Sequence, residues 1–279
     1  MKATNECYPC LANLVRQAAG LATEDPELKA KAIEEGLKLL DREFSTEKVS
    51  IAVATPLHRL VRMVTGNPDP YRLMKEAEVD MARSLRKGWR NNPEANLRDY
   101  MVLAVLGNNI DFFKDLKQIK KDIGMPVEFA VDHIKELESK LKKTRRILYL
   151  ADNAGEVFFD LPLVEKLQDF APVTYVVKES PVQNDITLAD LKEFGLANEL
   201  RRVITTGTDT PGVDMAMASD EFKLEFDAAD LVLAKGMGYW ETLSELKPQG
   251  KVFYLLKAKC KPVADSLDVE LNSYVALLR

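Results

Sequence analysis

Short apolar runs separated by helical patterns make up the second half of the 279-residue chain, and they restrict its fold more than any other feature. The runs occupy residues 146–151, 173–177, 202–205, 230–234 and 252–256. Each has the length of a strand, and most are rich in β-branched or aromatic residues. Strands that alternate with helices pair in parallel, and strands buried on both faces are apolar throughout. The sequence therefore predicts an α/β fold with a doubly wound, mostly parallel sheet between helical layers, an α/β/α sandwich.

Helical patterns fill the first half of the chain. Asp25-Pro26 and Asp69-Pro70 are typical helix starts, because proline is tolerated in the first turn of a helix. Residues 126–141 are expected to form a last, charged helix. The sequence therefore predicts an all-helical domain over residues 1–143 and an α/β domain over residues 144–279. The C-terminal tail from Pro262 onward can return to pack on the helical domain.

Composition excludes several classes of protein. The net charge of -5 argues against binding to nucleic acid through bulk charge. No apolar run reaches the roughly twenty residues that cross a bilayer, and the N-terminus carries no secretory signal. The three cysteines, Cys7, Cys10 and Cys260, are expected to be reduced thiols in the cytoplasm. We expect neither nucleic acid nor a membrane as partner, and nothing in the sequence indicates an oligomeric state.

Polar residues follow the predicted strands at the edge where an open parallel sheet binds its ligands. Asp152, Asn153 and Glu156 follow the first strand, and Asp185 follows the second. Carboxylate and amide oxygens favour divalent ions such as Mg²⁺ and Mn²⁺. Such an ion assists phosphoryl transfer by neutralising phosphate charge and activating water. The sequence therefore predicts a metal site built from Asp152, Asn153 and Asp185.

Two further residues suit a phosphate group. Lys235 ends the fourth strand, and Gly207 lies in the loop after the third. Each candidate also has a structural alternative: Asp152-Asn153 and Asp185 are good helix caps, Glu156 suits the first turn of a helix, and Gly207 suits an ordinary turn. Their coincidence at one edge of the sheet favours the functional interpretation.

Several common catalytic motifs are absent. The turn after the first strand holds only Gly155, so it lacks the G-x-G-x-x-G pattern of dinucleotide sites. The chain has no Walker-type phosphate loop and no G-x-S-x-G nucleophile elbow. With His58 and His133 as its two histidines, a Ser-His-Asp triad on the sheet is not expected.

The pair Cys7 and Cys10 has the C-x-x-C spacing of a zinc knuckle. Cys260 and His58 would complete a Cys₃His site for structural zinc that joins the N-terminus, the helical domain and the last strand. The alternative is three ordinary buried thiols and a helix histidine whose hydrogen bonds are satisfied.

The motifs together resemble those of a known family, the damage-control phosphatases, formerly domain of unknown function 89, and in particular their short stand-alone prokaryotic branch. The likeness covers nearly the whole chain. It rests on Ala151-Asp152-Asn153-Ala154-Gly155-Glu156, Asn184-Asp185-Ile186-Thr187, Ala234-Lys235-Gly236-Met237, Gly107-Asn108-Asn109-Ile110-Asp111, His58-Arg59, Asp69-Pro70-Tyr71 and Ala258-Lys259-Cys260-Lys261-Pro262-Val263-Ala264.

The resemblance implies a phosphatase that acts on small phosphate esters, including sugar phosphates, with Mn²⁺, Co²⁺ or Ni²⁺. It implies that Asp152, Asn153 and Asp185 hold the metal. Contacts with phosphate or substrate would come from Glu156 and Lys235, and from Asn108 and Asp111 on the helical side. In the working mechanism Lys235 neutralises charge on the phosphoryl oxygens.

Two other functions remain open on the sequence. One is S-adenosylmethionine-dependent carboxyl methylation, which has been linked to a relative in the broad family. The other is a non-catalytic protein that binds phosphorylated metabolites.

Overall fold

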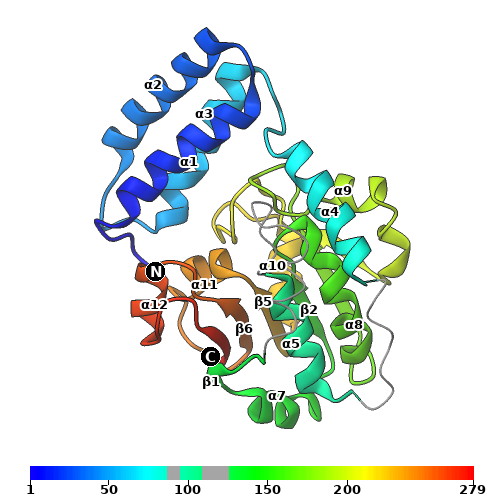
Figure 1. Cartoon of the computed structure of the whole chain (residues 1–279). Helices are drawn as coiled ribbons and strands as arrows, with labels where there is room; N and C mark the ends of the chain where they lie inside the picture. Colours follow the sequence, from blue (N-terminus) through cyan, green and yellow to red (C-terminus); the bar gives the residue numbers. More distant parts are fainter. Residues whose placement is uncertain (87–94, 109–125) are drawn as a thin grey trace.

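The computed structural model describes residues 1–86, 95–108 and 126–279, and these residues form a seven-stranded sheet between two layers of helices (Figure 1). The strand order is β1-β7-β6-β5-β2-β3-β4. Among the described strands, β7 runs antiparallel to β6, and the other neighbours pair in parallel. The predicted doubly wound, mostly parallel sheet is confirmed. Its strands are β1 (Phe129–Asp132), β2 (Ile147–Leu150), β3 (Val173–Val177), β4 (Val203–Thr205), β5 (Leu231–Lys235), β6 (Val252–Lys257) and β7 (Tyr274–Leu278).

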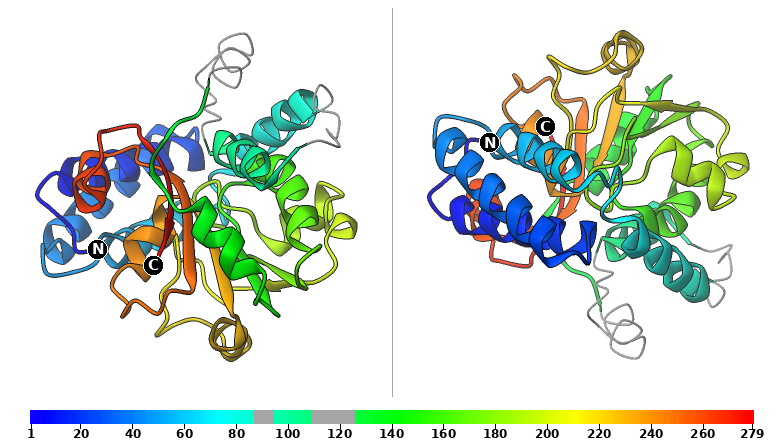
Figure 2. Two further views of the ribbon diagram at one scale, coloured as in Figure 1. Left: turned by 90° about the horizontal axis from the view of Figure 1, so that it is seen from below. Right: turned by 90° about the horizontal axis from the view of Figure 1, so that it is seen from above.

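Alternate residues of the central strands point into two separate hydrophobic cores, as expected for a sheet buried on both faces. Figure 2 shows helices on both faces of the sheet. One core is covered by α4 (Arg72–Arg86), α5 (Leu97–Gly107), α7 (Ile134–Leu141), α8 (Val157–Leu167) and α9 (Leu188–Glu193). The other is covered by α10 (Asp220–Ala228), α11 (Met237–Leu243) and α12 (Lys261–Leu267). The short 3₁₀ helices η1 (Ala154–Glu156) and η2 (Ala197–Glu199) complete the described elements of this part.

The first three helices form a bundle beside the sandwich: α1 (Cys7–Ala22), α2 (Pro26–Glu43) and α3 (Ser50–Thr65) (Figure 1). The bundle has its own core, in which Val15, Leu40 and Leu57 are fully buried. Asp25 caps α2 by accepting hydrogen bonds from the backbone N–H groups of the first turn, as the Asp25-Pro26 pair predicts. Gly36 lets α2 approach α1 closely, since a Cβ there would lie 2.5 Å from a methyl carbon of Val15.

The region before residue 143 differs from its prediction. The helix expected over residues 126–141 is wrong in its first part, because residues 129–132 form β1 at the sheet edge next to β7. Only α7 occupies the second part. The predicted division at residue 143 therefore falls within the sandwich, because α4, α5 and β1 precede it and pack in the layers of the sheet. The C-terminal tail forms α12 and β7, and β7 completes the sheet.

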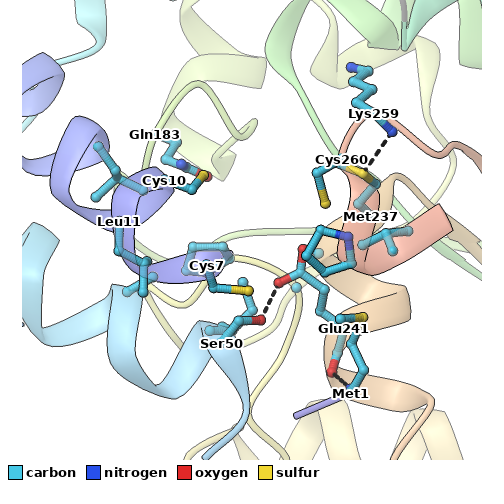
Figure 3. A pocket seen from close by; sticks show the side chains of 18 of the residues that line it. Met1, Cys7, Cys10, Leu11, Ser50, Gln183, Met237, Glu241, Lys259 and Cys260 are labelled. Carbon is cyan, nitrogen blue, oxygen red and sulfur yellow. Dashed lines mark hydrogen bonds between the residues drawn. The ribbon is translucent and has the colours of Figure 1, made fainter. Parts of the chain in front are cut away.

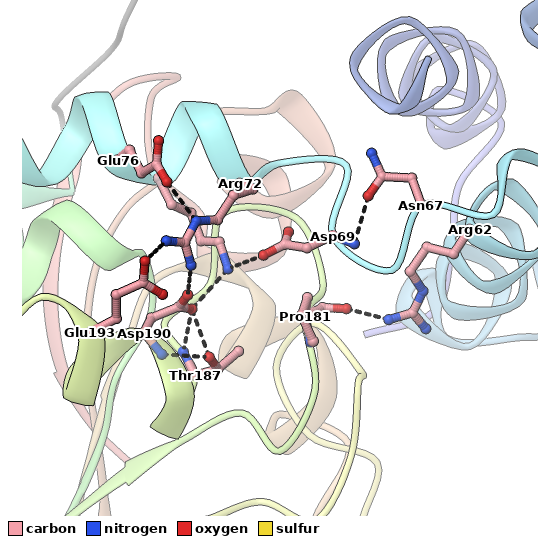
Figure 4. Close-up of polar contacts among 10 residues, drawn as sticks. Arg62, Asn67, Asp69, Arg72, Glu76, Pro181, Thr187, Asp190 and Glu193 are labelled. Atoms are coloured by element: carbon pink, nitrogen blue, oxygen red, sulfur yellow. Dashed lines mark hydrogen bonds and ion pairs between the residues drawn. The ribbon is translucent and has the colours of Figure 1, made fainter.

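A buried network of ion pairs connects the linker after α3 to the first turn of α9 (Figure 4). The fully buried Lys75 of α4 lies 2.6 Å from Asp69 in the linker and 2.8 Å from Asp190 in α9. Asp190 also forms a capping box with Thr187, which starts α9. The linker and the segment at Thr187 are therefore held by the same ammonium group.

The bundle contacts the loops at the carboxyl ends of the strands. Arg59 and Arg62 of α3 both pair with Asp209, which follows β4. Arg62 also donates to the carbonyl of Pro181 in the loop after β3 (Figure 4). The bundle thus lies over the edge of the sheet where ligands are expected. No helix in the described part of the chain is long and apolar enough to cross a bilayer.

We predict that Lys75→Met lowers the free energy of unfolding by about 3–5 kcal/mol, because it leaves the buried carboxylate of Asp190 without its main partner. Urea denaturation measures the change. Lys38→Met is the matched control, because Lys38 forms an exposed pair with Glu34 and its loss should leave stability nearly unchanged. Equal effects of the two substitutions would contradict the structural role assigned to Lys75.

Candidate functional site

The backbone brings the predicted metal ligands together at the carboxyl ends of β2 and β3. Asn153 and Asp185 form an isolated antiparallel bridge. The N–H of Ile186 donates to the carbonyl of Asp152 at 2.9 Å, and the N–H of Ala154 donates to the carbonyl of Asn184 at 2.9 Å. Asp152, Asn153 and Asp185 therefore lie side by side, although 32 residues separate the second from the third.

Two amide side chains hold the carboxylates of this site. Asn108, at the end of α5, donates from Nδ2 to Asp152 Oδ2 at 3.0 Å and to Glu156 Oε1 at 2.6 Å. Asn153 donates from Nδ2 to the same two oxygens, at 3.3 Å and 2.7 Å. The amide N–H groups are thus directed at the carboxylates, which leaves the amide oxygens as further ligands for a cation.

Three buried oxygens at the site have no hydrogen-bond partner: Asn108 Oδ1, Asp185 Oδ2 and Glu78 Oε2. The nearest cation to Asp185 is Lys178, whose Nζ lies 3.5 Å from Oδ2. Asn108 and Asp185 line the same cavity. A buried polar atom without a partner is costly, and a divalent ion bound by oxygen ligands would satisfy both of their oxygens. The site therefore fits the kind of metal that the sequence predicts.

The residue after Lys235 allows Asp152 to adopt its position. Gly236 has φ +77°, and a Cβ there would lie 1.9 Å from Asp152 Oδ2. Any other residue would collide with the carboxylate. The glycine is thus required twice, for its positive φ and for the close approach of the β2 loop.

Lys235 is fully buried and does not line the cavity. Its Nζ lies 2.7 Å from Glu156 Oε2 and 2.8 Å from Asp160 Oδ1. Burial lowers the pKa of Lys235, but Asp160 and Glu156 outweigh burial and raise it above its ordinary value. In this structure Lys235 neutralises two carboxylates, and it does not face the space where a phosphate would bind.

The carboxyl groups of the site repel one another. Burial raises the pKa of Asp152 well above its ordinary value, and the charges of Glu156 and Asp185 raise it further. Burial also raises the pKa of Asp185 to about 6, although Lys178 opposes the shift. Burial and like charge thus disfavour ionisation of both groups, and a further positive charge nearby would favour it.

A cavity of about 290 Å³ opens between this cluster and the helical bundle (Figure 3). Lys259, in the loop after β6, is a side chain of its wall, and its charge lowers the pKa of Asp152. Gln183 reaches the wall from the loop after β3, with a left-handed φ of +46°. Lys259 is thus a cationic side chain at the cavity, whereas Lys235 is not.

Two other predicted substrate residues, Glu156 and Gly207, do not line the cavity. Gly207 forms a turn with φ +73°, and a Cβ there would lie 2.5 Å from the Cβ of Ser219. Gly207 therefore serves the turn, as the structural alternative had it. The glycine of this loop that does reach the cavity is Gly212. Asp111 lies outside the described residues.

The structure places three of the four predicted zinc ligands at the cavity. Cys7, Cys10 and Cys260 line it, but His58 does not. His58 is buried in α3, where its ring packs edge-on against Tyr71, and burial lowers its pKa to about 4. The described residues therefore do not assemble the Cys₃His site.

No group of three or more His, Cys, Asp or Glu side chains in the described ranges is arranged to hold a metal. An ion beside Asp152 and Asp185 would therefore require amide oxygens as further ligands.

Sequence reasoning missed three charged residues of the site. Asp160 lies one helical turn after Glu156. Lys178 directly follows β3, and its position resembles that of Lys235 at the end of β5. Both positions were visible as patterns in the sequence. Glu78 of α4 was not, because it reaches the site only through packing: Asn184 Nδ2 donates to its Oε1 at 2.6 Å.

Known proteins resemble the chain along its whole length. A family model described as the damage-control phosphatase ARMT1-like domain matches residues 3–275. The chain is 34% identical to a damage-control phosphatase of Pyrococcus horikoshii, over 99% of this chain and 98% of that protein. It is 31% identical to a damage-control phosphatase of Archaeoglobus fulgidus, over 99% of both. A crystal structure of a DUF89 family protein from Pyrococcus horikoshii matches with a TM-score of 0.92 and 34% identity, covering 100% of this chain and 99% of that one.

We predict a pH dependence of stability that originates at Glu78. Burial raises its pKa from 4.5 to about 8, so between these values the unfolded chain loses a proton that the folded protein keeps. Stability then falls as pH rises through this interval, by up to about 1.4 kcal/mol per pH unit. Glu78→Gln should remove this part of the slope in urea denaturation between pH 4.5 and 8.

Glu76→Gln is the matched control, because Glu76 lies on the same helix with 42% of its side chain exposed. It should keep the wild-type slope. A Glu78→Gln protein whose stability still falls as steeply as that of the wild type would contradict the assignment.

Proposed function

The chain belongs to the damage-control phosphatase ARMT1-like family, as its motifs predicted, and from this premise we propose that it is a metal-dependent phosphatase of small phosphorylated metabolites such as sugar phosphates. The family assignment supports phosphatase activity of the house-cleaning type. The dependence on a metal and the class of substrate are our proposals.

The observation that carries the proposal is a pair of buried oxygens without a hydrogen bond, Asn108 Oδ1 and Asp185 Oδ2, of which the second has only an ion pair with Lys178 at 3.5 Å. These oxygens border the cavity, among carboxyl groups whose pKa values burial raises. A hard divalent cation satisfies both the orphaned atoms and the excess of negative charge.

The proposed reaction is the hydrolysis of a phosphate monoester. Asp152, Asn153 and Asp185 would hold Mn²⁺, Co²⁺, Ni²⁺ or Mg²⁺, with Asn108 as a further oxygen donor. A bound divalent ion would supply neutralisation of the phosphate charge and a water of lowered pKa.

Residues of the chain would do the rest. Lys259 would attract the phosphate from the cavity wall. Lys235 would act indirectly, because it fixes Glu156, and Glu156 in turn accepts hydrogen bonds from Asn108 and Asn153. The carboxylate thus orients both amide groups towards the metal position.

The site disfavours one rival function, methyl transfer, and does not distinguish the other, binding without catalysis. The loop after β2 carries oxygen ligands in place of the glycine-rich turn usual in doubly wound methyltransferases. A binding protein without catalysis would use the same residues, and phosphate release distinguishes it from an enzyme.

A screen for phosphate release tests the proposal. Purified protein is incubated with sugar phosphates and nucleotides in the presence of Mg²⁺, Mn²⁺, Co²⁺ or Ni²⁺. We expect release that requires one of these ions and stops on chelation. Asp152→Ala should lower kcat/KM by at least about 100-fold, because altering residues that only support metal ligands already costs about 10–100-fold.

Asp227→Ala is the control, since Asp227 is exposed on α10 and far from the loops of β2 and β3 in the sequence. It should keep wild-type activity. Full metal-dependent activity in Asp152→Ala would refute the assignment of this residue. Saturable binding of S-adenosylmethionine without any metal, and without phosphate release, would instead favour the methyltransferase.

A further inference from the structure

The loop after β3 holds Gln183 in a backbone conformation that is rare for residues other than glycine. Gln183 has a φ of +46°, and it lies inside a turn that the N–H of Asp185 closes by donating to the carbonyl of Val182 at 3.2 Å. Glycine adopts a positive φ without strain, whereas a side chain there crowds the backbone. Strained residues of this kind gather at ligand-binding sites, so Gln183 is a candidate for a role that needs its side chain.

The residues on either side of Gln183 are anchored. The carbonyl of Pro181 accepts a hydrogen bond from Arg62, and Val182 is buried. On the other side, Asn184 Nδ2 donates to a carboxylate of α4 at 2.6 Å. The Gln183 side chain, in contrast, lies at the wall of the cavity (Figure 3). The loop therefore presents this side chain to the cavity from a fixed position.

The Gln183 amide is free to bind a ligand, whereas other polar groups of the cavity wall are engaged. The amides of Asn108 and Asn153 donate to carboxylates, and Glu241 accepts a hydrogen bond from Ser50 Oγ at 2.5 Å (Figure 3). Among the residues that the structure describes, none forms a hydrogen bond with the side chain of Gln183. A ligand that enters the cavity therefore meets an amide whose donor and acceptor are both available.

Charge decides what this amide would recognise. Lys259 carries a positive charge at the cavity wall, which suits a phosphate, and Glu6 carries a negative charge there, which opposes one. Gln183 is uncharged and offers both a donor and an acceptor, the same combination that a hydroxyl group offers. Its side chain therefore suits an uncharged hydroxyl group of the substrate rather than the phosphate itself.

We propose that Gln183 is a specificity-determining residue that hydrogen-bonds a hydroxyl group of a sugar phosphate whose phosphate lies beside Asp152 and Asp185. This inference rests on the proposed phosphatase function and deepens it by assigning a contact with the sugar. Two residues of extended chain span at most about 7 Å, so the backbone of Gln183 lies within that distance of Asp185. This reach suits a hydroxyl group near the phosphate ester bond.

The test compares substrates with and without hydroxyl groups on a six-carbon body. Glucose, mannose and fructose 6-phosphates are assayed against hexyl phosphate with the metal-loaded wild-type protein, and the sugar phosphate with the highest kcat/KM is the reference. We expect the reference to exceed hexyl phosphate by at least about 10-fold, because a site that hydrogen-bonds hydroxyl groups rejects analogues without them. Gln183→Leu should reduce this ratio several-fold, through a lower kcat/KM for the sugar phosphate alone.

Gln183→Gly separates the side chain from the loop geometry. It should lower the ratio as Gln183→Leu does, because it removes the same amide. Its free energy of unfolding in urea should stay nearly unchanged, because the relief of strain offsets the entropy that glycine adds to the unfolded chain. Gln17→Leu is the matched control, since Gln17 is exposed on α1 and does not line the cavity, and it should keep the wild-type ratio.

A wild-type protein that hydrolyses hexyl phosphate as efficiently as the sugar phosphates would overturn the inference and leave the phosphatase function intact. An unchanged ratio in folded Gln183→Leu and Gln183→Gly would also overturn it. So would an equal loss of kcat/KM for both kinds of substrate, which indicates a displaced Asp185. Absence of release by the wild-type protein from every substrate with every ion would refute the phosphatase function, and the inference with it.

Discussion

The meeting of Asp152 and Asp185 at the ends of two adjacent parallel strands is the constraint on which the rest of the structure depends. Backbone hydrogen bonds between the two loops fix this meeting, so the carboxylates cannot move apart. Burial and mutual repulsion raise the pKa of both groups. Two buried lysines, Lys178 and Lys235, lie in direct contact with the cluster, but each is already engaged with a carboxylate. A further cation at this position would lower the pKa of both carboxyl groups.

The surrounding elements serve to hold this arrangement. Asn108 reaches the carboxylates from α5 on the helical side of the cavity. Lys75 connects the linker of the bundle to Asp190, which caps the helix that follows Asp185. The bundle itself closes the cavity with α1 and α3. The charged cluster thus depends on contacts with helices that are distant in sequence.

Much of this could be predicted from sequence, for identifiable reasons. Strands buried on both faces are apolar throughout, so five of the seven were visible, and the residues after them located the site. The edge strand β1 was missed because its short alternating pattern lies beside a charged helix. The direction of Lys235 was missed because its partner Asp160 lies inside α8, and periodicity does not report which buried groups meet. His58 was misassigned because sequence does not show that its ring packs on Tyr71, away from the cysteines.

The most direct test of the central claim is the effect of Mn²⁺ on the free energy of unfolding, measured by urea denaturation in the wild type and in Asp185→Asn. An ion bound only by the folded protein should stabilise the wild type by about 2.7 kcal/mol at 100 times its dissociation constant. Asp185→Asn should lose most of this gain, because the site loses the negative charge of one carboxylate ligand. Stability that is independent of Mn²⁺ in the wild type, or an equal gain in both proteins, would contradict the account.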